Sequence, residues 1–264
     1  AMAVVEYDKK GPGKILWAAH AERYSKIKND HFLNWEIVNE ANTFGPFNKV
    51  VYYEKPLLKK TRQLYAGQWK DALSYTEMPQ WHLDHFNIKI DEYVKHHDSH
   101  AAAGYFTSPY KDAVILTVDA IGEWETVSIA KGYNQKEIER MENIKYPHSL
   151  GILYSAFTHR CGLKPAEEEY ILMGMAAYGK PKYKEEIYND FVYQSPFKLK
   201  QNLHRGLGDW HPEADPMDIA ASIQAVTEEC LADLWFRASK YGSRNLVYAG
   251  GVALNCAANK VLAN

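Results

Sequence analysis

The residues best suited to chemistry are three histidines in the segment KHHDSH, at positions 95–100. If a helix begins here, His96 and His100 lie about one turn apart on the same side, a spacing suited to one shared cation. The spacing alone leaves open whether His96 or His97 faces inward. A polar loop with helix-capping residues is the alternative interpretation of this segment.

A second candidate is Asp119, which ends the apolar run AVILTV and begins a turn that contains Gly122 and Glu123. A carboxylate at the end of a strand is well placed to bind a metal or to lie near a phosphate. Aspartate is also a common turn former, so the position by itself is equally compatible with a structural role.

A pair of glycines marks the third candidate, the segment AGGVALN at 249–255. Gly250 and Gly251 follow a short apolar strand and precede a predicted helix, whose N-terminal end favours an anion or a nucleotide. Tight packing of the strand against the helix would require the same glycines. The position after an apolar strand favours the nucleotide interpretation.

A fourth segment, YYEKPLLKKTR at 52–62, mixes basic and aromatic residues, and Tyr65 and Trp69 continue the pattern. One interpretation is a surface that binds single-stranded nucleic acid by stacking and phosphate contacts. The other is a solvated helix face above a buried aromatic stripe.

A predicted α/β arrangement positions these residues. Strands are expected in an opening hairpin with a turn at 8–13, in a later meander and in one further run: 3–7 and 14–19, then 113–119, 126–131 and 137–144, then 245–251. Amphipathic spacing and capping residues predict helices at 31–41, 56–69, 149–161, 182–192, 217–240 and 253–263. Strands followed by helices occur twice, which suggests two RNase H-like lobes, at 1–112 and 113–264. Because the hairpin resembles only the second and third strands of the meander, we expect a first strand to be missing before residue 1.

Composition sets outer limits on the function. The chain has 264 residues, 46% hydrophobic and 24% charged, with a net charge of -2, which argues against disorder, coiled coil and general attraction to nucleic acid or membranes. The apolar stretches are too short to span a membrane and no secretory signal is evident, so a cytoplasmic protein is expected. Three widely spaced cysteines, Cys161, Cys230 and Cys256, argue against a disulfide framework and a thiolate zinc site.

Longer motifs carry a family resemblance. They are HAERYSKIKND (20–30), YYEKPLLKKTR (52–62), HHDSHAAAGYFTSP (96–109), VDAIGEWETVSIA (118–130), PHSLGILYSAFTHRCGLKPAEEEYILMGMAAYGKP (147–181) and YAGGVALNCAAN (248–259). In this order, and over nearly the whole chain, they resemble the nodulation-type and antibiotic-tailoring O-carbamoyltransferases.

The resemblance implies a domain of the actin/Hsp70-like ATPase superfamily, related to the universal tRNA threonylcarbamoyladenosine enzymes. In such proteins a C-terminal YrdC-like domain makes carbamoyl-adenylate from carbamoyl phosphate and ATP. The domain resembled here transfers the carbamoyl group to an acceptor hydroxyl. We therefore expect the sequence to be an excerpt that lacks the first strand, a further metal-binding aspartate and the YrdC-like domain.

The resemblance also implies roles for residues that match the motifs. Those expected to bind a divalent metal, Fe(II) by similarity, are His96, His100 and Asp119. Those expected to line the nucleotide site are Gly250, Gly251 and Asn255. Those expected to contact the carbamoyl-nucleotide or the acceptor are Glu22, Arg23 and Lys28.

The predicted reaction is carbamoyl transfer to a hydroxyl, with the metal polarising the carbonyl and a general base taking the hydroxyl proton. His97, Asp98 and Glu123 are unranked candidates for that base. The acceptor stays open between a small molecule, a sugar and a hydroxymethylated nucleobase in DNA. Two other hypotheses are a tRNA threonylcarbamoyl transferase-like enzyme and a nucleic-acid-binding fragment without activity. No membrane partner is expected, and the oligomeric state is open, a homodimer included.

Overall fold

The protein is described from a computed structural model that covers residues 1–7, 13–28, 30, 32–193 and 195–263. The chain divides into two compact units, Ala1–Ser99 and His100–Asn264. The prediction from sequence placed a lobe boundary after residue 112. The structural division falls after Ser99, one turn into helix α6 (His96–Phe106), so this continuous helix belongs partly to each unit.

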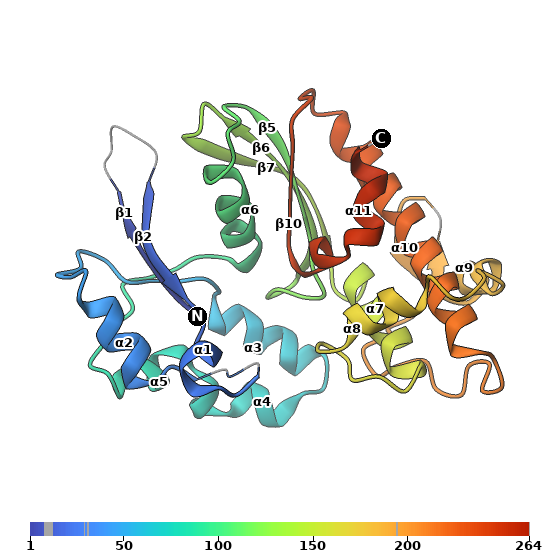
Figure 1. Ribbon diagram of the computed structural model, residues 1–264, viewed down its shortest axis with the longest axis horizontal. Helices are drawn as coiled ribbons and strands as arrows, with labels where there is room; N and C mark the ends of the chain where they lie inside the picture. Colours follow the sequence, from blue (N-terminus) through green and yellow to red (C-terminus); the bar gives the residue numbers. More distant parts are fainter. Residues whose placement is uncertain (8–12, 29, 31, 194, 264) are drawn as a thin grey trace. The chain divides into compact units, whose positions relative to one another are not determined.

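The first unit combines short helices with two small sheets (Figure 1). Its elements before α6 are β1 (Met2–Glu6), β2 (Lys14–Ala19), α1 (Glu22–Ser25), α2 (Trp35–Asn42), β3 (Val51–Tyr52), α3 (Pro56–Tyr65), α4 (Trp69–Leu73), η1 (Tyr75–Glu77), α5 (Pro79–Asp84) and β4 (Glu92–Tyr93). The antiparallel pairing of β1 with β2 confirms the predicted hairpin, and most of the predicted turn at 8–13 lies outside the described residues. Strands β3 and β4 pair in parallel.

Two helix predictions in this unit were wrong in extent. Helix α2 begins at Trp35, later than predicted, because the Asn34 side chain caps it by accepting a hydrogen bond from the Ile37 N–H at 3.0 Å. The predicted helix at 56–69 is two helices, since α3 ends at Tyr65 and α4 begins at Trp69. Gly67, with φ of 76°, lies between them in a conformation that no α-helix contains.

The second unit is built on a four-stranded sheet in the order β10-β5-β6-β7. The meander β5 (Ala113–Val118), β6 (Glu125–Tyr133) and β7 (Glu137–Lys145) is antiparallel, as predicted. Strand β10 (Leu246–Ala249) lies parallel to β5 on its other side. A three-stranded meander joined by a distant parallel strand is the arrangement expected for an RNase H-like lobe, and the whole chain is mixed α/β.

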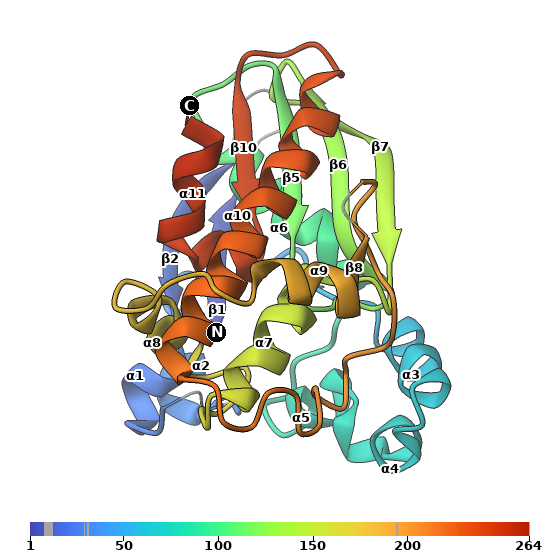
Figure 2. The same ribbon diagram turned by 90° about the vertical axis from the view of Figure 1, so that its right-hand side faces the viewer.

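Helices cover both faces of this sheet (Figures 1 and 2). Ala113 and Ile115 of β5 pack with Ala101 and Tyr105 of α6 in one buried cluster. Because alternate residues of a strand point to opposite faces, the intervening apolar residues face α10 (Pro216–Ser239), which contacts β5. Burial on both faces explains why every residue of β5 is buried.

The remaining elements of the second unit follow β7 in the chain, and several of them pack against α10. They are α7 (Leu150–Arg160), α8 (Glu169–Met175), α9 (Lys184–Phe191), β8 (Val192–Tyr193), β9 (Lys198–Leu199), the short 3-10 helix η2 (Gly251–Leu254) and α11 (Cys256–Ala263). Asp215 caps α10, as expected for the helix predicted at 217–240, by accepting from the Met217 N–H, and Ser149 caps α7 by accepting from the Ile152 N–H. The predicted helix at 253–263 instead begins as η2 and restarts at Cys256. No helix in the described ranges is long and apolar enough to cross a membrane.

Candidate metal centre and adjoining pocket

Helix α6 brings two histidines together with Asp119 at the end of β5. One potential ligand atom from each of His96, His100 and Asp119 lies within 4.8 Å of the others. The helix begins at His96, so His96 and His100 are one turn apart on one side, as the spacing predicted. His96 joins the cluster, whereas the side chain of His97 is fully buried. Two imidazoles and one carboxylate are a donor set that suits Fe(II) or Zn(II).

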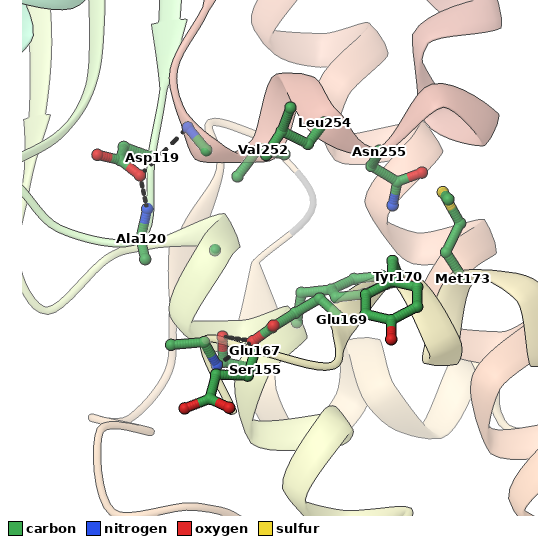
Figure 3. Close-up of a pocket in the computed structure, with 14 residues that line it drawn as sticks. Asp119, Ala120, Ser155, Glu167, Glu169, Tyr170, Met173, Val252, Leu254 and Asn255 are labelled. Carbon is green, nitrogen blue, oxygen red and sulfur yellow. Dashed lines mark hydrogen bonds between the residues drawn. The ribbon is translucent and has the colours of Figure 1, made fainter. Parts of the chain in front are cut away.

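The two oxygens of the Asp119 carboxylate have different partners. Oδ1 accepts hydrogen bonds from the backbone N–H groups of Ala120 at 2.8 Å and Gly251 at 3.3 Å (Figure 3). Oδ2 lies 3.4 Å from Nε2 of His100. One oxygen therefore ties the strand end to the glycine segment, and the other is directed toward the histidine.

Glycines allow the ends of β5 and β10 to approach so closely. Gly250 has a φ of 99°, and a Cβ atom built on it would lie 2.2 Å from the Val118 carbonyl oxygen. A Cβ atom on Gly251 would lie 2.8 Å from Asp119 Oδ1. Close packing of the two strand ends therefore requires glycine at both positions, which was one of the two interpretations of this pair. The same packing places the Gly251 N–H beside Asp119.

The PHSLG motif holds the turn that follows Asp119. The Ser149 hydroxyl donates to the carbonyl oxygen of Ala120 at 2.5 Å. The Ser149 hydroxyl oxygen also caps α7 by accepting from the Ile152 N–H. Gly151, in the first turn of α7, leaves room for this turn, because a Cβ atom there would lie 2.5 Å from the Cα atom of Ala120. The motif thus fixes the backbone of the turn that begins at Asp119.

A pocket of about 380 Å³ opens beside this turn, entirely within the second unit, and Asp119 is part of its wall. Figure 3 shows side chains reaching it from α7, α8 and the segment after β10. Its apolar and aromatic lining residues include Tyr154, Tyr170, Met173, Val252 and Leu254. Its polar lining residues include Ser155, Glu167, Glu169 and Asn255.

Hydrogen bonds order the polar side of the pocket. Glu169 Oε1 accepts from the Ser155 hydroxyl and from the Ala166 N–H, each at 2.6 Å. The Asn255 amide donates to Gln224 Oε1 at 3.0 Å, and its oxygen caps α11 by accepting from the Ala258 N–H. Asn255 lines the pocket, and its cap explains why α11 restarts after η2.

Burial changes the chemistry of Tyr154, which shares Gln224 with Asn255. The Tyr154 hydroxyl donates to Gln224 Oε1 at 3.0 Å. Desolvation raises the pKa of Tyr154 well above its usual value, so the hydroxyl stays protonated throughout the physiological range. Tyr154 can donate a hydrogen bond but does not serve as a base.

The three candidates for a general base differ in exposure. His97 is fully buried and Glu123 is 4% exposed, whereas Asp98 is intermediate. His97 and Asp98 lie in the first turn of α6, and Glu123 lies in the turn between β5 and β6. The role of each as a general base stays a prediction.

The predicted substrate contacts lie in the first unit. Glu22 and Arg23 belong to α1, and Lys28 follows that helix. Arg23 and Lys28 are exposed, and Glu22 is half-buried. The pocket lies in the second unit, and the roles of these three residues stay predictions.

The basic and aromatic segment differs from the predicted helix face above a buried aromatic stripe. Tyr65 and Trp69 are 68% and 62% exposed, so the prediction of a buried aromatic stripe was wrong for them. Lys60 donates to three backbone carbonyls at the end of α4, and Arg62 is buried and donates to Gln68. These two cations therefore join α3 to α4, and binding of nucleic acid by this segment stays a prediction.

Residue patterns did not single out the α8 side of the pocket. Tyr170 and Met173 are three positions apart, on neighbouring turns of α8, and Glu169 precedes them. The run EEYILMGM is part of the long motif at 147–181 that carries the family resemblance. The resemblance did not place α8 beside the pocket, because the location of α8 depends on its packing against α7 and α10.

Comparisons with known proteins agree with the motifs. The family model described as "Carbamoyltransferase N-terminus" matches residues 51–264. The uncharacterized protein sll1178 of Synechocystis is 33% identical over 94% of this chain and 48% of its own length. The nodulation proteins NolNO of Sinorhizobium fredii and NolO of Bradyrhizobium diazoefficiens are 28% and 26% identical over 66% and 63% of this chain, and over 28% and 32% of their own lengths.

The chain thus spans about half or less of these relatives. Among solved structures, it is similar to the activator of 2-hydroxyisocaproyl-CoA dehydratase from Clostridium difficile with bound ADPNP, at 14% identity and a TM-score of 0.40. That alignment covers 67% of this chain and 60% of the activator. From the match over residues 51–264, this chain belongs to the carbamoyltransferase N-terminal family.

Proposed function

We propose that this chain transfers a carbamoyl group from carbamoyl-adenylate to an acceptor hydroxyl, within an enzyme that makes the adenylate from carbamoyl phosphate and ATP. The proposal rests on one observation, that Asp119 contributes to two neighbouring features. This residue belongs to the histidine cluster and to the pocket wall. A metal-binding group is thereby adjacent to a space that suits a nucleotide.

The proposed metal is Fe(II) or a similar divalent ion held by His96, His100 and Asp119. The donor set fits such an ion, and the ligand atoms are already close together. When bound, the metal would act as a Lewis acid that polarises the carbamoyl carbonyl. Fixing the Asp119 carboxylate through Ala120 and Gly251 keeps one ligand in place before the metal arrives.

The pocket would hold the nucleotide portion of the substrate. Tyr170, Met173 and Leu254 offer surfaces for a base, while the Ser155 and Glu169 pair offers polar contacts for a ribose. Held in this way, the carbamoyl carbon would lie near the acceptor oxygen, which lowers the entropic cost of the reaction.

The reaction exchanges one bond for another. The acceptor oxygen forms a bond to the carbamoyl carbon, the bond from that carbon to the phosphate oxygen breaks, and AMP leaves. The hydroxyl proton passes to a general base, for which Asp98 is the least buried of the three candidates. The acceptor we propose is a small molecule or a sugar that carries a free hydroxyl.

The direct test supplies separately prepared carbamoyl-adenylate to the chain with a panel of hydroxyl compounds, and mass spectrometry follows the O-carbamoyl product and AMP. We expect product with the wild type, none with His100→Ala, and wild-type amounts with His159→Ala, a change at an exposed position of α7. Equal product from wild type and His100→Ala would contradict the proposal.

A further inference from the structure

Glu54, in the YYEKPLL motif, belongs to neither the pocket nor the metal cluster. Its side chain is only 9% exposed, although it carries a carboxylate. Burying a carboxylate is costly unless it contacts partners that favour its charge. The partners of Glu54 therefore indicate what it does.

Each oxygen of Glu54 faces a different partner. Oε1 accepts from the Lys59 ammonium at 2.8 Å, and Oε2 lies 4.0 Å from Nδ1 of His96. That Nδ1 atom is itself buried. The distance is longer than a hydrogen bond, and such contacts commonly shorten when a site binds its ligand. Lys59 fixes one oxygen and so directs the other toward His96.

The backbone keeps this arrangement in place. Strands β3 and β4 run side by side, and the Val94 N–H donates to the Tyr52 carbonyl at 2.9 Å. One residue further along, the Ser99 hydroxyl donates to the Tyr53 carbonyl at 2.9 Å. His96 and Ser99 lie on neighbouring turns of α6, so the helix start is attached to the segment that carries Glu54.

We propose that Glu54 is a positioning residue that orients the His96 imidazole, and thereby strengthens binding of a divalent metal. This rests on the proposed function of the His96, His100 and Asp119 cluster. Because Nδ1 faces Glu54, the opposite nitrogen, Nε2, is the atom left to bind the ion. Histidine ligands commonly donate their second N–H to a carboxylate, and loss of such partners typically lowers metal affinity roughly 10- to 100-fold.

The test measures Co(II) binding to the full chain by visible absorption, with a competing chelator to set the affinity. We expect Glu54→Gln to weaken Co(II) binding roughly 10- to 100-fold and to change the absorption spectrum. Glu54→Asp, which retains the charge, should bind more tightly than Glu54→Gln. Glu92→Gln is the matched control, because Glu92 forms an exposed ion pair with Lys49 in the same unit.

The outcomes separate this inference from the proposed function. Saturable Co(II) binding that His100→Ala abolishes and Glu54→Gln leaves unchanged would overturn the role of Glu54 and keep the metal centre. Absence of saturable binding by the wild type would overturn both. Circular dichroism checks the fold of each variant. If Glu54→Gln does not fold, Lys59→Met, which releases Oε1 alone, must weaken Co(II) binding or the inference fails.

Discussion

Nε2 of His100 lies 3.4 Å from Oδ2 of Asp119, although one residue is on α6 and the other follows β5. The contact depends on a chain of backbone restraints, because Asp119 is held by the Gly251 N–H and its turn is held by Ser149.

Gly250→Ala should lower the free energy of unfolding by more than the roughly 1–3 kcal/mol that a positive φ alone costs a residue with a side chain. The added Cβ would contact the Val118 carbonyl at 2.2 Å. Gly162→Ala is the control, since Gly162 has a φ of 78° with nothing within 4 Å of the added atom. Urea unfolding measures both. Equal losses for the two variants would show that the close approach has no energetic consequence.

Ser149→Ala should cost about 1 kcal/mol of stability, the usual value of an N-cap, and should also weaken binding of a non-hydrolysable ATP analogue. The second effect is expected because Ser149 holds the Ala120 carbonyl at the pocket wall. Asn34→Ala removes a comparable cap from α2 and should affect stability alone. Calorimetric titration compares the two, and similar affinities would argue against a role for the Ser149 contact.

Tyr170→Ala should weaken binding of the same analogue roughly 5- to 150-fold, because stacking of an aromatic ring on a base typically contributes about 1–3 kcal/mol. Tyr178→Ala removes a tyrosine that is 83% exposed and lies outside the pocket. That control should bind as the wild type does. A nucleotide affinity that is insensitive to Tyr170 would place the base elsewhere.

Asp218 should give a pH-dependent contribution to stability. Hydrogen bonds from the Lys182 ammonium and the Lys180 N–H hold the pKa of its carboxyl below the usual value. Because the folded-state pKa is lowered, the contribution is present above the unfolded pKa of about 3.9 and is lost as the pH falls through the folded value. Asp218→Asn should therefore lower the midpoint of urea unfolding at pH 7. The gap between the midpoints of the variant and the wild type should narrow below about pH 4. The exposed change Asp209→Asn should produce no such gap.

Much of this architecture was predictable because it depends on local patterns. The strand β5, the Asp215 cap of α10 and the spacing of His96 and His100 each follow from neighbouring residues. Choosing His96 over His97 required the phase of α6, since a shift of one residue rotates a side chain by about 100° around the axis. Glu54 and Tyr170 were not singled out, because the contacts of Glu54 with His96 and of Tyr170 with the pocket come from tertiary packing.

Metal analysis of the purified protein tests whether His96, His100 and Asp119 bind one metal ion. Wild type and the exposed control His159→Ala should carry about one iron or zinc ion per chain, and His96→Ala and His100→Ala should lose it. Metal content that is negligible in the wild type, or unchanged in both histidine variants, would contradict the account.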